Sequence, residues 1–300
     1  MQLHPEIQSV IDAAPARNLA DGTVEQARAG HAAGAAARPP GPEMAEVEEV
    51  SVGGRPARRY VPHGATGAGL VFFHGGGWVV GSRDTHDGPC RYLAERSGAT
   101  VLSVEYRLAP EHRFPAAFDD AVAAVREVLG GSDSAVDPTR VAVGGDSAGG
   151  NLAAAAALEL RDAPAGAPVR AQLLIYPAVD ASMASDSHAA FAAGPFLTAK
   201  DMRWFYDLYA CDADPTDWRL SPLAADDLSG LPSTLVITAE NDVLRDEGEA
   251  FAHALAEAGG DATAVRHAGA THGFFGWYHA AAPSRAAVEL AGAWLRSKLG

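Results

Sequence analysis

The chain has 300 residues, 48% of them hydrophobic, which is enough to bury a large core and argues against disorder. Its 38 acidic residues outnumber 23 basic ones, and the formal net charge of −15 argues against nucleic acid or an anionic membrane surface as a partner. No apolar run approaches the roughly 20 residues that a membrane-spanning helix needs.

The two cysteines and the amino terminus indicate a compartment. Cys90 and Cys211 fit no metal-binding spacing, and a chain of this size needs no disulfide, so we expect two free thiols. The first residues lack a basic stretch followed by an apolar run, so we expect no signal peptide. We therefore expect a soluble, cytoplasmic protein.

The first forty-odd residues predict short alanine-rich helices that end at the breaker cluster "ARPPGPEM". From Val47 to His267 the sequence then predicts eight strands: "VEEVSV", "ARRYV", "GLVFFH", "TVLSVEY", "RVAVGG", "AQLLIYP", "STLVITAE" and "ATAVRHA". The first two runs alternate and indicate antiparallel strands. The later runs are continuously apolar, as strands covered on both faces are.

Helical stretches separate the later strands, for example Pro115–Leu129, Ser147–Asp162 and Leu244–Ala258. This alternation predicts the α/β class, with a mostly parallel eight-stranded sheet flanked by helices.

One aromatic-rich segment, residues 181–219, interrupts the alternation and is too long for an ordinary loop. We expect it to form a helical cap together with residues 1–45. The catalytic core would then comprise residues 46–180 and 220–300.

A serine follows the fifth predicted strand in the pattern Gly145-Asp146-Ser147-Ala148-Gly149. Between a strand and a helix, Gly-x-Ser-x-Gly is typical of a nucleophile on a sharp turn, because glycines leave room where a Cβ would clash. Amide N–H groups at the helix start would stabilise negative charge beside it. Ser147 is therefore the candidate nucleophile, and a simple helix N-cap is the alternative.

A serine hydroxyl needs a base, and in enzymes with this turn the acid and then the histidine follow the serine along the chain. Three acids after the strand "STLVITA" are candidates: Glu240, Asp242 and Asp246. Glu240 lies at the strand edge, where we expect it to bind backbone, and Asp246 suits the first turn of the next helix. Asp242 lies in the middle of the loop and is the candidate acid; a solvated acidic turn is the alternative.

Four histidines follow the candidate acid: His253, His267, His272 and His279. His253 lies inside a predicted helix, His267 inside the last predicted strand, and His279 in the stretch that leads to the final helix. His272 comes just after the last strand, beside a glycine, where a loop residue can reach the serine. It is the candidate base.

A glycine loop, "HGGGWVVGS", follows the third predicted strand. Three glycines in a row indicate that main chain must approach another group closely. In hydrolases with such a loop, its amides and the amide after the nucleophile form the oxyanion hole, here Gly76, Gly77 and Ala148, with Gly75 a weaker candidate. A phosphate-binding loop is the alternative, but no Gly-Lys-Ser/Thr follows. We expect His74, which opens the loop, to be structural.

Five stretches between Leu70 and Trp277 carry a resemblance to a known family: "HGGGWVVGS", "EYRLAPEHRFPAAFDDA", "GDSAGGNLA", "LSGLPSTLVITAENDVLRDEG" and "THGFFGW". Through them the chain resembles the bacterial hormone-sensitive-lipase-like esterases, family IV of the lipolytic enzymes, in the GDSAG-type branch. The resemblance implies an α/β-hydrolase core under a helical cap, carboxylesterase activity, and no cofactor or metal. It assigns Ser147, Asp242 and His272 as nucleophile, acid and base.

The expected function is hydrolysis of short- to medium-chain acyl esters through an acyl-enzyme, with a small-molecule ester as the partner. Aromatic and aliphatic side chains near the motifs are candidate walls of the substrate pocket: Trp78, Phe196, Leu197, Trp204, Phe274 and Phe275. The resemblance is also compatible with a homodimer through the outer edge strand.

Two other functions fit parts of this pattern. An amidase, a deacetylase or a dehydratase could use the same three catalytic residues. A non-catalytic small-molecule receptor could use the same scaffold, as the gibberellin receptors do, but those lack the triad histidine, whereas His272 is present here.

Overall fold

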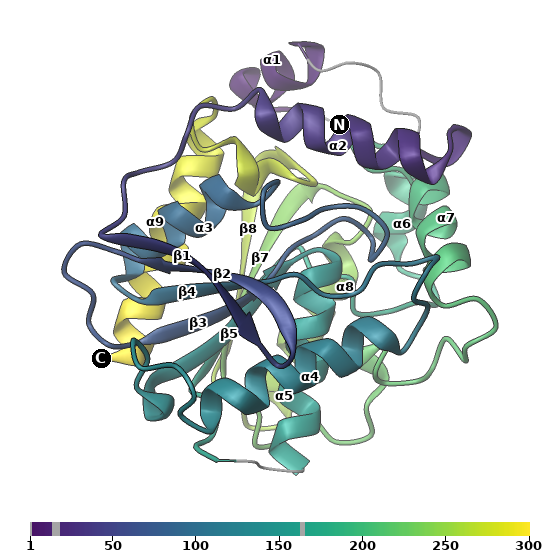
Figure 1. Cartoon of the computed structure of the whole chain (residues 1–300). Helices are drawn as coiled ribbons and strands as arrows, with labels where there is room; N and C mark the ends of the chain where they lie inside the picture. The colour runs from purple at the N-terminus through teal and green to yellow at the C-terminus, as the bar shows by residue number, and fades with distance from the viewer. Residues whose placement is uncertain (1, 14–18, 163–165) are drawn as a thin grey trace.

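The computed structural model describes residues 2–13, 19–162 and 166–300 (Figure 1). These residues form one eight-stranded sheet in the order β1-β2-β4-β3-β5-β6-β7-β8. The strands are β1 (Glu46–Val52), β2 (Arg55–Val61), β3 (Gly69–Phe73), β4 (Thr100–Val104), β5 (Val141–Asp146), β6 (Ala171–Ile175), β7 (Ser233–Asn241) and β8 (Ala262–Thr271). β2 is antiparallel to β1 and to β4, and all other neighbours are parallel. The predicted sheet is confirmed.

Helices cover both faces of the sheet (Figure 1). One face carries α3 (Asp87–Ser97) and α9 (Ala282–Leu299). The opposite face carries α4 (Ala116–Leu129), α5 (Ala148–Asp162) and α8 (Arg245–Glu257). Among the described residues, no helix has the length and apolar character to cross a lipid bilayer.

Strand β3 shows why its sequence is continuously apolar. Leu70 and Phe72 pack in the core beneath α3 and α9. Val71 and Phe73, which point the other way, pack in the core beneath α4, α5 and α8. Since both faces of the strand are buried, no position is left for a polar residue.

A layer of helices lies across the carboxyl ends of the strands (Figure 1). It consists of α1 (Pro5–Ala13), η1 (Leu19–Asp21), α2 (Val24–Ala36), α6 (Asp186–Ala190) and α7 (Ala199–Tyr209). The remaining short 3₁₀ helices are η2 (Pro138–Arg140), η3 (Pro222–Ala224) and η4 (Phe274–Trp277). The helices expected over the first forty residues are present, apart from residues 14–18, which lie outside the described residues.

The amino-terminal segment and the inserted segment are joined at the start of α7. Thr198 and Asp201 form a capping box that begins this helix. Asp201 Oδ1 also accepts a 3.3 Å hydrogen bond from the backbone amide of Ala20, and Lys200 pairs with Asp21. The Asp201 side chain therefore caps the start of α7 and also holds the amino-terminal segment beside this helix.

Arg28 attaches α2 to the core. Its guanidinium donates to the Val79 carbonyl at 2.9 Å, to the Ala109 carbonyl at 2.9 Å and to the Glu111 carboxylate at 2.7 and 2.8 Å. These three acceptor groups lie on two loops of the core, so the planar guanidinium of Arg28 holds one face of α2 against both loops.

Four loops meet at the carboxyl edge of the sheet because β3, β5, β7 and β8 run parallel. The first residues after these strands include His74, Ser147, Asp242 and His272. The topology thus brings together motifs that are up to 198 positions apart, from 74 to 272.

Candidate active site

Ser147 occupies a one-residue turn between strand and helix. β5 ends at Asp146 and α5 begins at Ala148, which leaves Ser147 with a φ of 57° in the left-handed region. Such a backbone costs a non-glycine residue roughly 1–2 kcal/mol and persists where the surroundings determine it. Here the Ser147 amide donates to the Ile175 carbonyl at 2.8 Å.

The glycines of the motif are required by close contacts. A Cβ placed on Gly145 would lie 2.4 Å from the backbone of Gly149. A Cβ placed on Gly149 would lie 1.9 Å from the Phe73 carbonyl oxygen. Any side chain at either position would collide with backbone, so the strand, the turn and the helix can pack this closely only with glycine.

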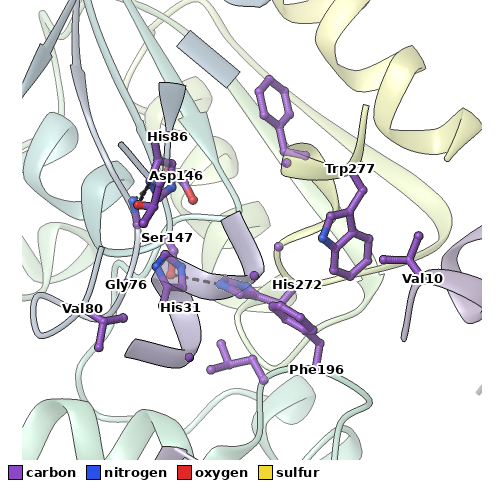
Figure 2. Close-up of a pocket in the computed structure, with 18 of the residues that line it drawn as sticks. Val10, His31, Gly76, Val80, His86, Asp146, Ser147, Phe196, His272 and Trp277 are labelled. Carbon is purple, nitrogen blue, oxygen red and sulfur yellow. Dashed lines mark hydrogen bonds and ion pairs between the residues drawn. The ribbon is translucent and has the colours of Figure 1, made fainter. Parts of the chain in front are cut away.

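Ser147, His272 and Asp242 form a continuous hydrogen-bonded row. Ser147 Oγ lies 3.0 Å from His272 Nε2, and His272 Nδ1 lies 2.8 Å from Asp242 Oδ2. Figure 2 shows Ser147 and His272 facing each other in the cavity. Asp242 is 1% exposed, whereas Ser147 and His272 are each 7% exposed and reach the cavity.

The loops that carry the acid and the base are tied together. The Thr271 hydroxyl donates to the Asn241 carbonyl at 3.0 Å, one residue before each functional side chain. Asp242 Oδ1 also accepts from the Leu244 amide at 3.1 Å, which orients the carboxylate. β7 extends to Asn241, one residue beyond the predicted run "STLVITAE", because its end pairs with Thr271 of β8.

The other candidate acids and histidines have different contacts. Glu240 accepts from the Gly269 amide at 2.7 Å, as predicted for a residue that binds backbone. Asp246 accepts from the Ser187 amide at 2.8 Å and so links α8 to the cap. His253 is exposed on α8, and His267 lies within β8.

The glycine loop has a backbone that glycine alone accommodates. Gly76 and Gly77 have φ values of 125° and 57°. A Cβ on Gly76 would lie 2.2 Å from the Val80 carbonyl oxygen, and one on Gly77 would lie 2.2 Å from the Phe205 ring. In the described part of the chain, the amides of Gly76, Gly77 and Ala148 donate to no acceptor, so they are available to a bound molecule.

Asp146 supports the glycine loop. Its Oδ1 accepts from the Gly75 amide at 2.8 Å. The same atom lies 3.2 Å from His86 Nε2, and Figure 2 shows Asp146 and His86 side by side next to Ser147. Burial opposes ionisation of Asp146, but His86, the Gly75 amide and His74 together hold the pKa of its carboxyl below the ordinary value. The loop therefore lies against a buried carboxylate.

His74 is structural, in line with the sequence interpretation. It is fully buried, its Nδ1 lies 2.8 Å from the Gly75 carbonyl oxygen, and its ring stacks on Tyr106 at 4.3 Å. Burial, together with the nearby His86, lowers the pKa of His74 from 6.5 to about 4.

A cavity of about 940 Å³ opens above Ser147. Its floor is the glycine loop and the Ser147–His272 pair, and its roof and walls come from α1, α2 and α7 and the turn at η4. Of the expected wall residues, Phe196, Leu197 and Phe275 line it. Further lining residues not expected from the sequence are Arg38, Phe72, Tyr176, Phe205 and Trp277.

Trp78, Trp204 and Phe274 do not line the cavity, contrary to the sequence expectation. Trp78 is fully buried and its indole stacks on Tyr209 of α7 at 4.6 Å. Phe274 is also fully buried and packs against Tyr176. Trp204 precedes the lining residue Phe205 on α7, so it points about 100° away around the helix.

Comparison with known proteins identifies relatives over most of the chain. A family model for the alpha/beta hydrolase fold matches residues 70–276. The carboxylic ester hydrolase LipN of Mycobacterium tuberculosis is 44% identical over 265 residues, which is 83% of this chain and 70% of that protein. The ethyl acetate hydrolase of Pseudomonas putida is 41% identical over 225 residues, 73% of this chain and 71% of that protein.

Solved structures agree over nearly the full length. The hyperthermophilic esterase of the archaeon Pyrobaculum calidifontis superposes with a TM-score of 0.91 at 41% identity, covering 99% of each chain. The resemblance to hormone-sensitive-lipase-like esterases noted from the sequence is confirmed by these matches.

Proposed function

We propose that this chain, a carboxylic ester hydrolase that belongs to the α/β-hydrolase family, cleaves esters through Ser147, His272 and Asp242. The supporting observation is the row of hydrogen bonds from Ser147 Oγ to His272 Nε2 at 3.0 Å and from His272 Nδ1 to Asp242 at 2.8 Å. His272 removes the serine proton while the oxygen attacks the ester carbonyl. Asp242 holds the ring in the required tautomer and stabilises the imidazolium that forms.

The oxyanion is held by the amides of Gly76, Gly77 and Ala148. The free N–H groups at the start of α5 and in the glycine loop support this assignment. His272 then protonates the leaving alcohol and activates water, which hydrolyses the acyl-enzyme.

The cavity supports short- to medium-chain acyl groups as substrates. Phe196, Phe205 and Trp277 line a space of about 940 Å³ beneath the cap helices. Residues 1–45 and 181–219 act as this cap, and residues 46–180 and 220–300 as the catalytic core. The cytoplasmic location and the homodimer stay predictions, which cell fractionation and light scattering test.

The test is a panel of p-nitrophenyl esters from acetate to palmitate, with a p-nitroanilide added, assayed with wild type and Ser147→Ala. We expect turnover of the shorter esters, weak or no anilide cleavage, and loss of turnover in Ser147→Ala with an unchanged circular dichroism spectrum. Ser297→Ala, at an exposed position on α9, is the matched control. Retained turnover in Ser147→Ala contradicts the nucleophile, a maximum at long chains contradicts the pocket, and faster anilide cleavage favours an amidase.

A further inference from the structure

The cavity contains an arginine that the proposed chemistry does not use. Arg38 follows the end of α2 and lines the same cavity as Ser147 and His272. Of the described residues that line this cavity, it is the single arginine or lysine. Its side chain comes from the amino-terminal segment, on the cap side of the site.

The carboxylates on the cavity lining are already paired. Glu6 accepts a hydrogen bond from the Ala282 amide, and Asp21 pairs with Lys200. Asp146 contacts both His86 and the Gly75 amide. Within the described part of the chain, no carboxylate lies within ion-pair distance of the Arg38 guanidinium, and no side-chain hydrogen bond satisfies it.

The surroundings of Arg38 are costly for an unpaired charge. Burial lowers the pKa of Arg38, although Tyr176 and Asp146 act in the opposite direction. Burial and the nearby Arg38 also lower the pKa of His279 on the same lining, so this histidine stays uncharged at neutral pH. Arg38 is half-buried, so its guanidinium has lost part of its hydration without gaining a carboxylate partner, and an anion that binds beside it in the cavity supplies that partner.

The backbone leaves room for the guanidinium. A Cβ placed on Gly276 would lie 2.9 Å from Arg38 Nη1, so a side chain there would compete for the same space. Gly276 itself lines the cavity, next to Phe275 and Trp277. The arginine head thus lies against bare main chain, with its donors open to the cavity.

We propose that Arg38 binds a carboxylate group of the substrate, so that the enzyme prefers esters that carry a carboxylate over neutral esters of the same shape. This inference rests on the proposed ester hydrolysis and names its substrate class. A guanidinium offers two parallel N–H donors that match the two oxygens of a carboxylate. The formal net charge of −15 disfavours an anionic substrate at the surface, so a preference for one requires a local cation such as Arg38.

The experiment compares matched anionic and neutral esters. Monomethyl glutarate and methyl 4-carbamoylbutanoate differ only in carboxylate against amide, and they place the group on the acyl side. Sodium 4-acetoxybutanoate and its amide place it on the alcohol side. The kcat/KM of each ester is measured by acid release, for wild type, Arg38→Gln, Arg38→Lys and the control Arg203→Gln, which removes an exposed arginine of α7 outside the cavity.

We expect the anionic-to-neutral ratio of kcat/KM in at least one pair to fall about tenfold or more in Arg38→Gln. Arg38→Lys should keep part of the ratio, and Arg203→Gln should keep all of it. A ratio that Arg38→Gln leaves unchanged in both pairs overturns the proposal, and so does an equal loss on the anionic and neutral esters, which a purely structural arginine would produce.

Binding without turnover separates this proposal from the proposed function. Isothermal titration of the same four esters into Ser147→Ala, with and without Arg38→Gln, measures the anion preference directly. A Kd for the carboxylate esters that rises about tenfold on loss of Arg38 supports the proposal even if wild type hydrolyses none of them. A Kd that does not change overturns the proposal, even if the neutral esters are hydrolysed well.

Discussion

The backbone amide of Gly75 donates a 2.8 Å hydrogen bond to the carboxylate of Asp146, the residue just before the candidate nucleophile. The nucleophile turn and the glycine loop are therefore held in register by one buried side chain. A Cβ on Gly75 would lie 2.4 Å from Asp146 Oδ2, so the two loops are also in close contact.

We predict that Asp146→Ala lowers kcat by at least about tenfold with little change in KM, because the glycine loop, whose amides we propose bind the oxyanion, loses its support. It also leaves the Gly75 amide without an acceptor, at a cost of about 1–3 kcal/mol in the free energy of unfolding. Asp146→Asn, whose amide oxygen can still accept from Gly75, should recover most of kcat. Steady-state kinetics and urea unfolding check both, and a kcat near wild type in Asp146→Ala refutes the positioning role.

A substitution at Gly77 tests the contact between the glycine loop and helix α7 of the cap. Gly77→Ala combines a left-handed backbone with a methyl group 2.2 Å from the Phe205 ring, so we expect the loop or α7 to shift and kcat/KM to fall at least about tenfold. The control is Gly54→Ala, in the turn between β1 and β2. Gly54 also has a positive φ, of 71°, but a Cβ placed on it would meet no atom within 4 Å. Equal activity of the two variants would contradict the predicted contact.

Stability should depend on pH through His74. Its pKa is about 4 in the folded protein against an ordinary 6.5, because burial disfavours the charged ring. Below about pH 6.5 the unfolded chain binds a proton that the folded chain does not, so stability is lost as the pH falls from there to about 4, by up to about 3 kcal/mol.

Urea unfolding between about pH 7.5 and 4.5 measures this loss, and His74→Gln should make the decline shallower. His253→Gln removes an exposed histidine of α8 and should keep the wild-type slope. If His74→Gln and His253→Gln lose stability equally over this range, His74 is not the source.

Arg28 should determine how firmly the amino-terminal helices bind the core. In Arg28→Ala, two backbone carbonyls, those of Val79 and Ala109, lose their donor, and we expect a loss of about 1–2 kcal/mol in the free energy of unfolding. Cleavage by trypsin within residues 1–45 should become faster. Residues of α2 line the cavity, so a loosened α2 should raise KM, whereas Arg28 itself does not line the cavity, so kcat should fall less. Arg203→Ala, an exposed change on α7, should leave both measurements unaltered.

Much of this architecture could be predicted because its signals are local. The inner strands β3 to β7 were readable from runs such as "GLVFFH", because strands covered on both faces are apolar. The expectation of a continuously apolar run was wrong for β8, an edge strand that exposes several of its residues. Ser147 was predictable from the spacing of its glycines, and His272 from its place just after a strand. In each case a short stretch of chain carries the whole constraint.

The cavity wall was less predictable because it depends on how separate elements cross. Trp78 follows the glycine loop directly, yet its indole stacks on Tyr209 of the inserted helix instead of facing the cavity. Arg38 lies in a stretch that signals only the end of a helix, and nothing in that stretch says which surface the helix covers. Both outcomes are set by the packing of the cap on the core.

The lining residues Glu6 to Arg38 precede the matched family segment, which begins at residue 70, whereas Ser147, Asp242 and His272 all fall within it. The proposed catalytic residues and a large share of the cavity lining thus lie in separate stretches of the sequence. Exchange of the first 45 residues between relatives should therefore transfer substrate preference while leaving the reaction intact. In such a protein, recombination before residue 70 is a direct route to new substrates.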